Sequence, residues 1–349
     1  MRLSVNLGYW GAGNDRENLA LAQEADRLGY DSAWAAEAYG SDAATVLSWV
    51  AAQTSRIDIG SAVFQIPART PAMTAMTAAT LDSLSGGRFR LGLGVSGPQV
   101  SEGLHGVRFD RPLGRTREYV AIVRTALARQ PVQYAGEHFT LPLPDGPGKA
   151  LRLTVGPARN PLPIYLAAVG PKNIELAGEI ADGWHAVFFA PEHAAESMAA
   201  LATGRARAAD PEKTFDVVAS VPIVLGDDPV ACAEPLRHHA ALYVGGMGSR
   251  EQNFYNRLAV RMGFETAARE VQDLYLARQH RDAAAAVPFE FVDATSLIGP
   301  VARVRDRLAA YAEAGVTTVS VTPYAPTLAE RLETLRALGE ALDASGLGD

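Results

Sequence analysis

Cysteine is nearly absent from this chain, because Cys232 is the single cysteine among 349 residues. One thiol cannot form an intramolecular disulfide, and it cannot supply a metal site that needs several cysteines. Structural disulfides belong to oxidising compartments, so their absence fits a reducing one. We therefore expect a cytoplasmic protein.

Long hydrophobic runs and an excess of positive charge are also missing. No apolar run approaches the roughly 20 residues of a transmembrane helix. The N-terminal segment Met1–Val5 leads directly into a strand-like alternation without a signal-peptide core. The formal net charge is −7, which argues against nucleic acid or an anionic membrane as a partner.

Lysine is scarce and occurs only at Lys149, Lys172 and Lys213, whereas arginine and alanine are abundant. This usage has no folding rationale, and we interpret it as the bias of a high-GC genome.

What the chain does have is a regular alternation of short apolar segments with capped, amphipathic ones. Thr70-Pro71, for example, places a capping hydroxyl before a proline at the first helical position. Alternating strands and helices favour an α/β fold with a parallel sheet, and eight strands favour a (β/α)8 TIM-like barrel. The predicted strands are residues 3–8, 31–37, 57–64, 88–95, 163–168, 184–189, 215–225 and 316–322.

Two regions interrupt the alternation. Residues 131–161 contain a candidate hairpin with Ala135-Gly136 at its turn, followed by a loop rich in proline and glycine. Residues 246–298 are mostly helical in pattern. Because no interdomain linker is visible, we predict one barrel domain over residues 1–349 with insertions at about 131–161 and 246–298.

A glycine motif follows the fourth predicted strand. Residues 92–97 read G-L-G-V-S-G and match the dinucleotide fingerprint G-x-G-x-x-G. Three strands precede the motif, and a loop with Pro98 and Pro112 is expected where the fingerprint requires a helix. We therefore favour a barrel strand whose glycines allow a flat ring to approach the backbone.

A second turn has the features of an anion site. The strand that ends at Ala168 continues through Val169 and Gly170 to Pro171 and Lys172 at the start of a helix. Free N–H groups and the helix dipole attract anions at such a point, and a lysine adds a positive charge. An ordinary strand-to-helix turn explains the same residues.

Isolated polar residues allow weaker inferences. Glu37 ends the second strand, at the face where barrel active sites form. His105, in the loop after the fourth strand, is a candidate proton donor or acceptor. His238 and His239 are adjacent on a helix, so they face different directions and do not form a metal pair. We predict no metal site.

The sequence resembles the luciferase-like superfamily, and within it the branch of oxidoreductases that depend on coenzyme F420. The resemblance runs from end to end. It rests on the segments Thr80–Gly97, Pro163–Asn173 and Ala181–Trp184, with Leu242–Asn256 similar to actinobacterial members.

This resemblance implies a cofactor across the C-terminal mouth of the barrel, and usually a homodimer. It places a non-prolyl cis peptide at Ala62-Val63 behind the deazaflavin ring and the cofactor phosphate at residues 168–172. It also places Glu37 near the polar edge of the ring. The residues expected to contact the ring and its side chain are Gln65, Ser96, Gly97 and Ser101.

Two departures bear on the reaction. Relatives that oxidise alcohols or sugar phosphates carry a histidine directly after the acid that ends the second strand. They also tend to have a glutamate just after the glycines of the fourth strand. This chain has Ala38 and Pro98 at those places. Oxidation of an alcohol needs a base, so we expect instead an F420H2-dependent reductase that transfers hydride from deazaflavin C5 to an activated C=C or C=N bond. Glu37, Tyr39 and His105 are the candidate proton donors.

Four other functions stay open at this point. The nearest is an FMN-dependent luciferase-like monooxygenase. Another is an F420-dependent alcohol or sugar dehydrogenase. A cofactor-binding protein without turnover and a metal-dependent sugar barrel are more distant. In every case we expect a small-molecule ligand.

Overall fold

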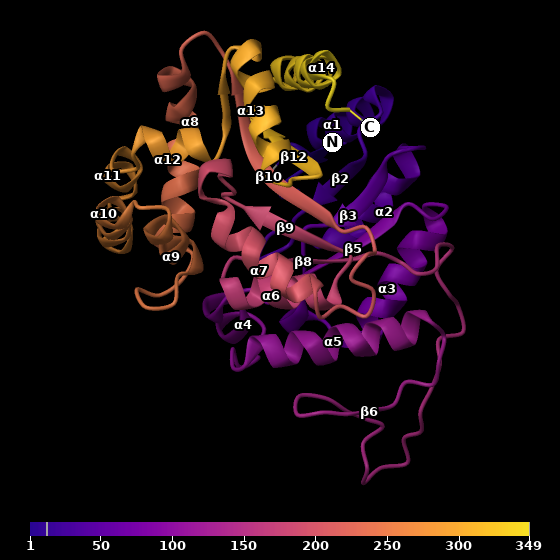
Figure 1. The fold of residues 1–349 in the computed structure, drawn as a ribbon. Coiled ribbons are helices and arrows are strands. Elements are labelled where there is room, and N and C mark those ends of the chain that lie inside the picture. The colour runs from indigo at the N-terminus through magenta and orange to yellow at the C-terminus, as the bar shows by residue number, and fades with distance from the viewer. Residues whose placement is uncertain (12, 349) are drawn as a thin grey trace.

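The computed structural model describes residues 1–11 and 13–348 (Figure 1). Eight parallel strands close into a barrel, which confirms the predicted fold. Around the barrel their order is β10-β12-β1-β2-β3-β5-β8-β9, and pairing of β9 with β10 closes it. The barrel strands are β1 (Arg2–Asn6), β2 (Ser32–Ala35), β3 (Asp58–Ser61), β5 (Phe89–Gly94), β8 (Ile164–Ala167), β9 (Gly183–Val187), β10 (Asp216–Leu225) and β12 (Thr318–Pro323).

Helices surround this barrel (Figure 1). Local sequence signals set several of their ends. The Thr70 hydroxyl accepts a hydrogen bond from the Met73 N–H at 3.2 Å, and Gly29 ends the first helix with φ of 79°. The barrel helices are α1 (Asp15–Leu28), α2 (Ala43–Gln53), α3 (Pro71–Leu84), α5 (Pro112–Leu127), α6 (Pro171–Ile180), α7 (Ala195–Arg205), α8 (Pro229–Ala241), α13 (Val301–Glu313) and α14 (Leu328–Ser345).

Three short elements differ from the sequence prediction. β4 (Phe64–Gln65) continues β3 alongside β5 after a break, and β11 (Leu297–Gly299) pairs with the end of β10. α4 (Pro98–Gly103) begins directly after Gly97. The expected loop at Pro98 was therefore wrong, although the barrel topology still excludes a dinucleotide fold built on the glycine motif.

Residues 131–161 contribute no strand to the barrel and extend away from it beyond α5 (Figure 1). They contain the antiparallel hairpin β6 (Tyr134–Ala135) and β7 (Thr140–Leu141). The predicted hairpin is present, but its turn begins one residue later than predicted: Ala135 pairs with Thr140 in the strands, and the Gly136 N–H donates to the Phe139 carbonyl at 2.9 Å.

The later irregular region carries its own hydrophobic cluster beside α8. A π-helical turn, η3 (Leu242–Gly246), leads from α8 into it, and its helices lie together at one side of the barrel (Figure 1). They are α9 (Phe254–Arg261), α10 (Glu265–Leu276), α11 (His280–Ala285) and α12 (Phe289–Ala294).

Large side chains fill the inside of the barrel, opposite glycines on facing strands. Trp34, Tyr165 and Val218 form a buried cluster there. A Cβ atom at Gly60 would lie 2.2 Å from the Trp34 ring, and one at Gly183 would lie 2.3 Å from the Tyr165 ring. The glycines therefore leave the room that these two rings occupy.

Arg90 occupies the barrel interior on the N-terminal side of these rings. Its guanidinium contacts Asp31 and Asp58 at 2.7 Å each, and its side chain is 9% exposed. Burial of this cation is offset by two carboxylates, as buried charges require. Together with the aromatic cluster it fills the barrel interior below the cavity at the C-terminal strand ends.

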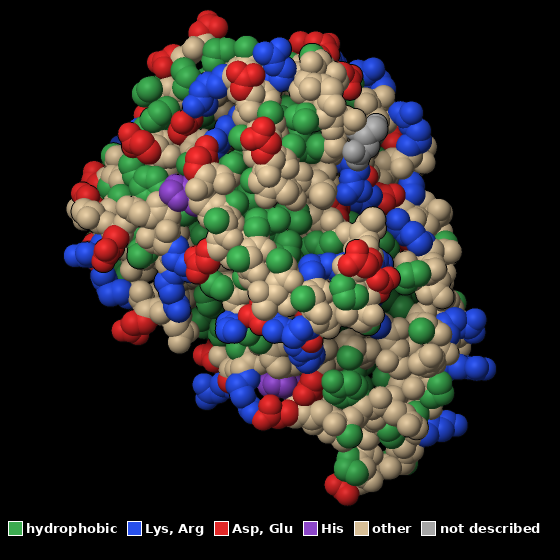
Figure 2. Space-filling view, viewed as in Figure 1, with side chains coloured by type: hydrophobic (Ala, Val, Ile, Leu, Met, Phe, Trp, Pro, Cys, Tyr) green, Lys and Arg blue, Asp and Glu red, His purple; other side chains and the backbone are tan. Residues whose placement is uncertain are grey.

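Positive and negative side chains are mixed over the face shown in Figure 2. In the described part of the chain, every helix is too short or too polar to span a membrane.

Replacing Gly60 with alanine should destabilise the protein, because the added methyl group would overlap the fully buried Trp34 ring. Overpacking of this kind costs about 1–3 kcal/mol, measurable as a lower free energy of unfolding in urea. Gly339→Ala is the matched control, since Gly339 lies in α14 with nothing within 4 Å of an added Cβ. That variant should gain up to about 1 kcal/mol. Equal stability of the two variants would contradict the packing argument.

Candidate active site

A cavity of about 1490 Å³ opens at the C-terminal ends of the barrel strands. Its walls come from the loops after the strands, from the 168–172 turn and from the segment that follows α8. This is the end of a (β/α)8 barrel where active sites form. The volume exceeds that of a typical pocket for one small ligand.

The floor of the cavity is built where β3 breaks. The Ala62-Val63 peptide is cis, as predicted. A Cβ atom at Gly94 would lie 2.5 Å from Val63 Cγ2, and one at Gly92 would lie 1.9 Å from the Ser61 carbonyl oxygen. The first two glycines of the motif therefore make room for the break in β3. The space beside Gly92 and Gly94, which was expected to admit a flat ring, is occupied by Ser61 and Val63 instead.

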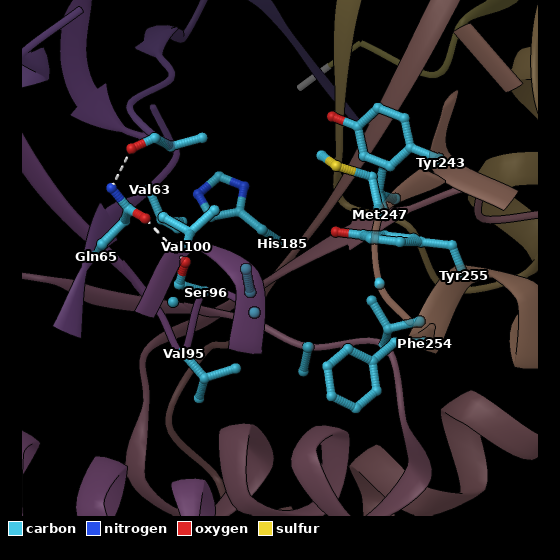
Figure 3. Close-up of a pocket in the computed structure, with 18 of the residues that line it drawn as sticks. Val63, Gln65, Val95, Ser96, Val100, His185, Tyr243, Met247, Phe254 and Tyr255 are labelled. Atoms are coloured by element: carbon cyan, nitrogen blue, oxygen red, sulfur yellow. Dashed lines mark hydrogen bonds between the residues drawn. The ribbon is translucent and has the colours of Figure 1, made fainter. Parts of the chain in front are cut away.

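A chain of side-chain hydrogen bonds ties three strand ends together beside this floor (Figure 3). The Ser96 hydroxyl donates to Gln65 Oε1 at 2.8 Å, and Gln65 Nε2 donates to the Ala38 carbonyl. Ser96 and Ala38 both have positive φ, 61° and 48°. Such backbone is unfavourable for residues other than glycine, and here the Gln65 side chain holds both loops.

Glu37 contributes to the same scaffold. Its carboxylate pairs with Arg69 at 2.7 Å and accepts the Gln65 N–H at 3.1 Å. Arg69 also pairs with Asp42. Glu37 is 8% exposed and lines the cavity, but both of its carboxylate oxygens are bonded to protein partners. This geometry suits a residue that positions the loops.

The 168–172 turn has the features of an anion site. Gly170 precedes α6, and among the described residues no acceptor pairs with the N–H groups of Val169, Gly170 or Lys172. An added Cβ at Gly170 would meet nothing within 4 Å, so the turn is open. Unpaired N–H groups at a helix N-terminus bind anions.

Two cations stand near this turn. The Lys172 ammonium pairs with Glu175 at 3.1 Å, and its side chain is 82% exposed. Arg261, from α9, donates to the Val169 carbonyl at 3.1 Å and lines the cavity. Sequence reasoning missed Arg261, because it lies 92 residues away along the chain and only the packing of α9 brings it here.

His185 from β9 lies in the floor and was also missed. Its ring meets the Trp34 ring edge-on with centroids 4.4 Å apart, and neither ring nitrogen has a partner among the described residues. Burial lowers its pKa from 6.5 to about 4, against a smaller opposing effect of Asp216. The imidazole is therefore neutral at pH 7.

The wall opposite the floor is aromatic (Figure 3). We call it the aromatic wall and define it as Tyr243, Phe254, Tyr255 and Tyr324. The Tyr243 and Tyr255 rings meet edge to face, 4.8 Å apart. Burial raises the pKa of Tyr255 to about 12 and raises that of Tyr243 well above its usual value of 10, so both phenols stay protonated.

Most residues predicted from the sequence meet in this cavity. Ser101 and His105 are not among its lining residues: the Ser101 hydroxyl donates to the Val107 carbonyl at 2.7 Å, and the His105 ring belongs to the turn that follows α4. The predicted residues that line the cavity are Glu37, Tyr39, Ala62, Val63, Gln65, Ser96, Gly97, Ala168, Val169, Gly170, Pro171 and Lys172.

Stability should fall as the pH decreases from 6.5 towards 4. In this window the unfolded chain binds a proton at each histidine, whereas folded His185 stays neutral. For each histidine that stays neutral in the folded protein, the free energy of unfolding falls by about 1.4 kcal/mol for each unit by which the pH decreases. Above pH 6.5 this pH dependence vanishes. The free energy of unfolding in urea across this range checks the slope.

His185→Gln should reduce the slope by about 1.4 kcal/mol per pH unit, because glutamine does not titrate. The contribution of His239, whose pKa burial also lowers to about 4, should remain. His238→Gln, at an exposed position, is the control and should leave the slope unchanged. An identical slope for wild type and His185→Gln would show that His185 titrates normally.

Comparisons with known proteins agree with the barrel and its cavity. The luciferase-like monooxygenase family model matches residues 6–318. A Mycobacterium tuberculosis protein with the provisional name coenzyme F420-dependent oxidoreductase is 44% identical over 97% of this chain and 99% of its own. A 5,10-methylenetetrahydromethanopterin reductase of Methanolobus tindarius is 30% identical over 64% of this chain and 66% of its own.

Among solved structures, the coenzyme F420-dependent tetrahydromethanopterin reductase of Methanopyrus kandleri superposes with a TM-score of 0.81. It is 23% identical and covers 98% of both chains, and so it supports the fold. The family match and the full-length relative go further: this chain belongs to the luciferase-like monooxygenase family.

Proposed function

We propose that this protein is an F420-dependent oxidoreductase that uses reduced F420 to transfer a hydride to an activated C=C or C=N bond of a small to medium organic substrate. The observation that carries the proposal is the division of one cavity into two parts. One part joins the Val63 floor to an open turn with unpaired N–H groups, and the other is the aromatic wall, with Arg257 over its Phe254 ring. The full-length mycobacterial relative, named for F420, supports the cofactor.

The residues present fit this cofactor. Val63 and the neighbouring strand ends offer an apolar surface for a flat ring, and the N–H groups at Val169, Gly170 and Lys172 suit its phosphate. Arg261 adds positive charge beside that turn. When bound in its reduced form, F420 supplies a hydride.

The chain's own residues orient the reactants. Gln65, held by Ser96 and Ala38, fixes the loops on one side of the ring site. Glu37 positions Arg69 and the Gln65 backbone. Two electrons arrive with the hydride, so one proton completes the reduced product. Tyr39, 64% exposed and lining the cavity, is the predicted residue best placed to relay that proton from water.

Reduction suits the site better than alcohol oxidation. An alcohol substrate must lose a proton to a base. At the positions where relatives keep that base, Ala38 carries no basic group, and the neighbouring Glu37 is engaged by Arg69. A dehydrogenase therefore stays the second candidate, and an FMN-dependent monooxygenase the third.

We also propose a homodimer. Met73 and Met76 lie three residues apart on α3 and are 50% and 48% exposed, and Trp49 on the adjacent α2 is 41% exposed. Exposed apolar side chains that share a face often mark an interface. A second copy of the chain is the occupant that the family resemblance implies.

F420 should bind more tightly than FMN, and Gly170→Asp should weaken F420 binding at least 10-fold. The aspartate fits without a clash, so its effect is repulsion of the cofactor phosphate. Titration followed by quenching of cofactor fluorescence gives both affinities. Gly170→Asn has nearly the same shape without the charge and should bind F420 almost normally.

Tight FMN binding without a response to F420 would exclude the proposed cofactor. Equal affinity of the aspartate and asparagine variants would place the phosphate away from Gly170.

The double variant Met73→Glu and Met76→Glu should be monomeric, whereas wild type should be dimeric. Charges on this face would have to be buried without partners in the dimer. Light scattering coupled to size-exclusion chromatography measures the mass. Val301→Glu on α13, where the valine is 43% exposed, is the control and should remain dimeric. A monomeric wild type would contradict the dimer.

A further inference from the structure

His239 lies at the last turn of α8 and lines the cavity beside the aromatic wall. Its ring centroid is 4.8 Å from that of Tyr243, 6.1 Å from Tyr324 and 5.8 Å from Phe188. His238, its neighbour in sequence, is exposed. The helix thus directs one histidine to solvent and the other to the cavity.

The His239 imidazole is neutral and unpaired. Burial alone lowers its pKa from 6.5 to about 4, with no charged group contributing. Its ring contacts are with Phe188, Tyr243 and Tyr324, which are uncharged at pH 7. Within residues 1–11 and 13–348, no hydrogen bond involves its ring. A neutral imidazole carries one donor and one acceptor, and both are available to a ligand in the cavity.

Asn253, which is 1% exposed, holds Tyr243 and Tyr255 of the aromatic wall in place. Its Nδ2 donates to the carbonyls of Tyr243 and Val244, at 2.9 Å each. Its Oδ1 accepts the N–H groups of Tyr255 and Asn256 at 2.9 and 3.0 Å. One side chain therefore connects η3 to the start of α9, and with them the two rings that meet edge to face.

Charge is distributed unevenly along the cavity. Among the described residues, its lining cations are Arg111, Lys172, Arg257 and Arg261. Arg261 bonds the 168–172 turn, Lys172 belongs to that turn, and Arg111 pairs with Glu137 at the rim. The fourth, Arg257, lies over the Phe254 ring, 5.7 Å from its centroid, and donates to the Glu251 carbonyl. Among the described residues, no charged group contributes to the pKa of His239, so a substrate phosphate or carboxylate would find no cation to offset it there.

We infer that His239 is the group that hydrogen-bonds the substrate, and that the substrate is an uncharged, flat compound with a carbonyl oxygen conjugated to the reducible bond. This inference rests on the proposed function, because it places the substrate between the ring site and the aromatic wall. The imidazole N–H donates to the carbonyl oxygen while the tyrosine rings pack against the apolar part of the compound.

A neutral imidazole is suited to this role. It polarises a carbonyl without giving up its proton, as neutral histidines do elsewhere. Negative charge develops on the carbonyl oxygen when hydride is added at the far carbon of the conjugated C=C bond. A fixed donor directed at that oxygen stabilises the charge. The proton that completes the product is added at carbon and comes from water.

The experiment uses two probes of similar shape, the uncharged ketone 2-cyclohexen-1-one and the charged 1-cyclohexene-1-carboxylate. Each is titrated into the purified protein with and without oxidised F420, in which state no turnover occurs. Calorimetry gives the dissociation constants, and nitrogen NMR of labelled histidines reports on the His239 ring, whose signal is assigned by its loss in His239→Phe.

We expect the ketone to shift the His239 signals and to bind at least 10-fold more tightly than the carboxylate. His239→Phe, which keeps an aromatic ring without the donor, should weaken ketone binding about 10-fold, the usual effect of losing one hydrogen bond in a closed site. His238→Phe is the matched control and should bind the ketone as wild type does. All three proteins should bind F420 equally.

Three results would overturn the inference: no binding of the ketone, equal binding of the two probes, or equal ketone binding by wild type and His239→Phe. Failure of F420 to bind would instead overturn the proposed function. The titrations without cofactor would still decide whether His239 contacts the ketone, so the two failures are separable.

Discussion

The close approach of β3 to β5 is the constraint on which the site depends. Ser61 and Val63 lie where side chains at Gly92 and Gly94 would otherwise stand, with the Ser61 hydroxyl donating to the Gly92 carbonyl at 2.8 Å. Any Cβ there would push the strands apart. The bare strand surface thus allows β3 to break at Ala62-Val63, and that break forms the cavity floor.

Polar contacts then convert this floor into a defined site. Gln65 follows the break and binds both Ser96 after β5 and Ala38 after β2. Glu37, itself paired with Arg69, accepts the Gln65 backbone N–H. Three strand ends are therefore fixed relative to one another before any ligand binds, which reduces the ordering that binding must impose.

Electrostatics divide the cavity into two parts. The helix N-terminus at Gly170 and the nearby Arg261 favour an anion. At the other part, burial keeps His239 neutral and the tyrosines protonated. A cofactor with a phosphate and a substrate without charge match this division, and the proposed function and the role of His239 both follow from it.

Sequence reasoning placed the barrel and the strand-to-helix turn at Gly170, because each leaves a local signal, whereas the cis peptide at Ala62-Val63 was expected only from the family resemblance. Alternating capped helices and apolar strands identify the barrel, and Gly170-Pro171 marks a strand-to-helix turn. The residues it missed have no such signal. His185 occupies an ordinary strand position, and Arg261, Tyr243 and Tyr255 come from a region that sequence marks only as helical.

By itself, then, the sequence determined the order of the elements and the turn that suits an anion, because capping, strand alternation and helix dipoles act over a few neighbouring residues. Only the tertiary structure decided which side chains face one another. It turned Glu37 towards Arg69, left His105 outside the cavity lining and brought His239 beside the aromatic wall. Burial and partners set the charge state of each group, and both depend on segments far apart in the chain.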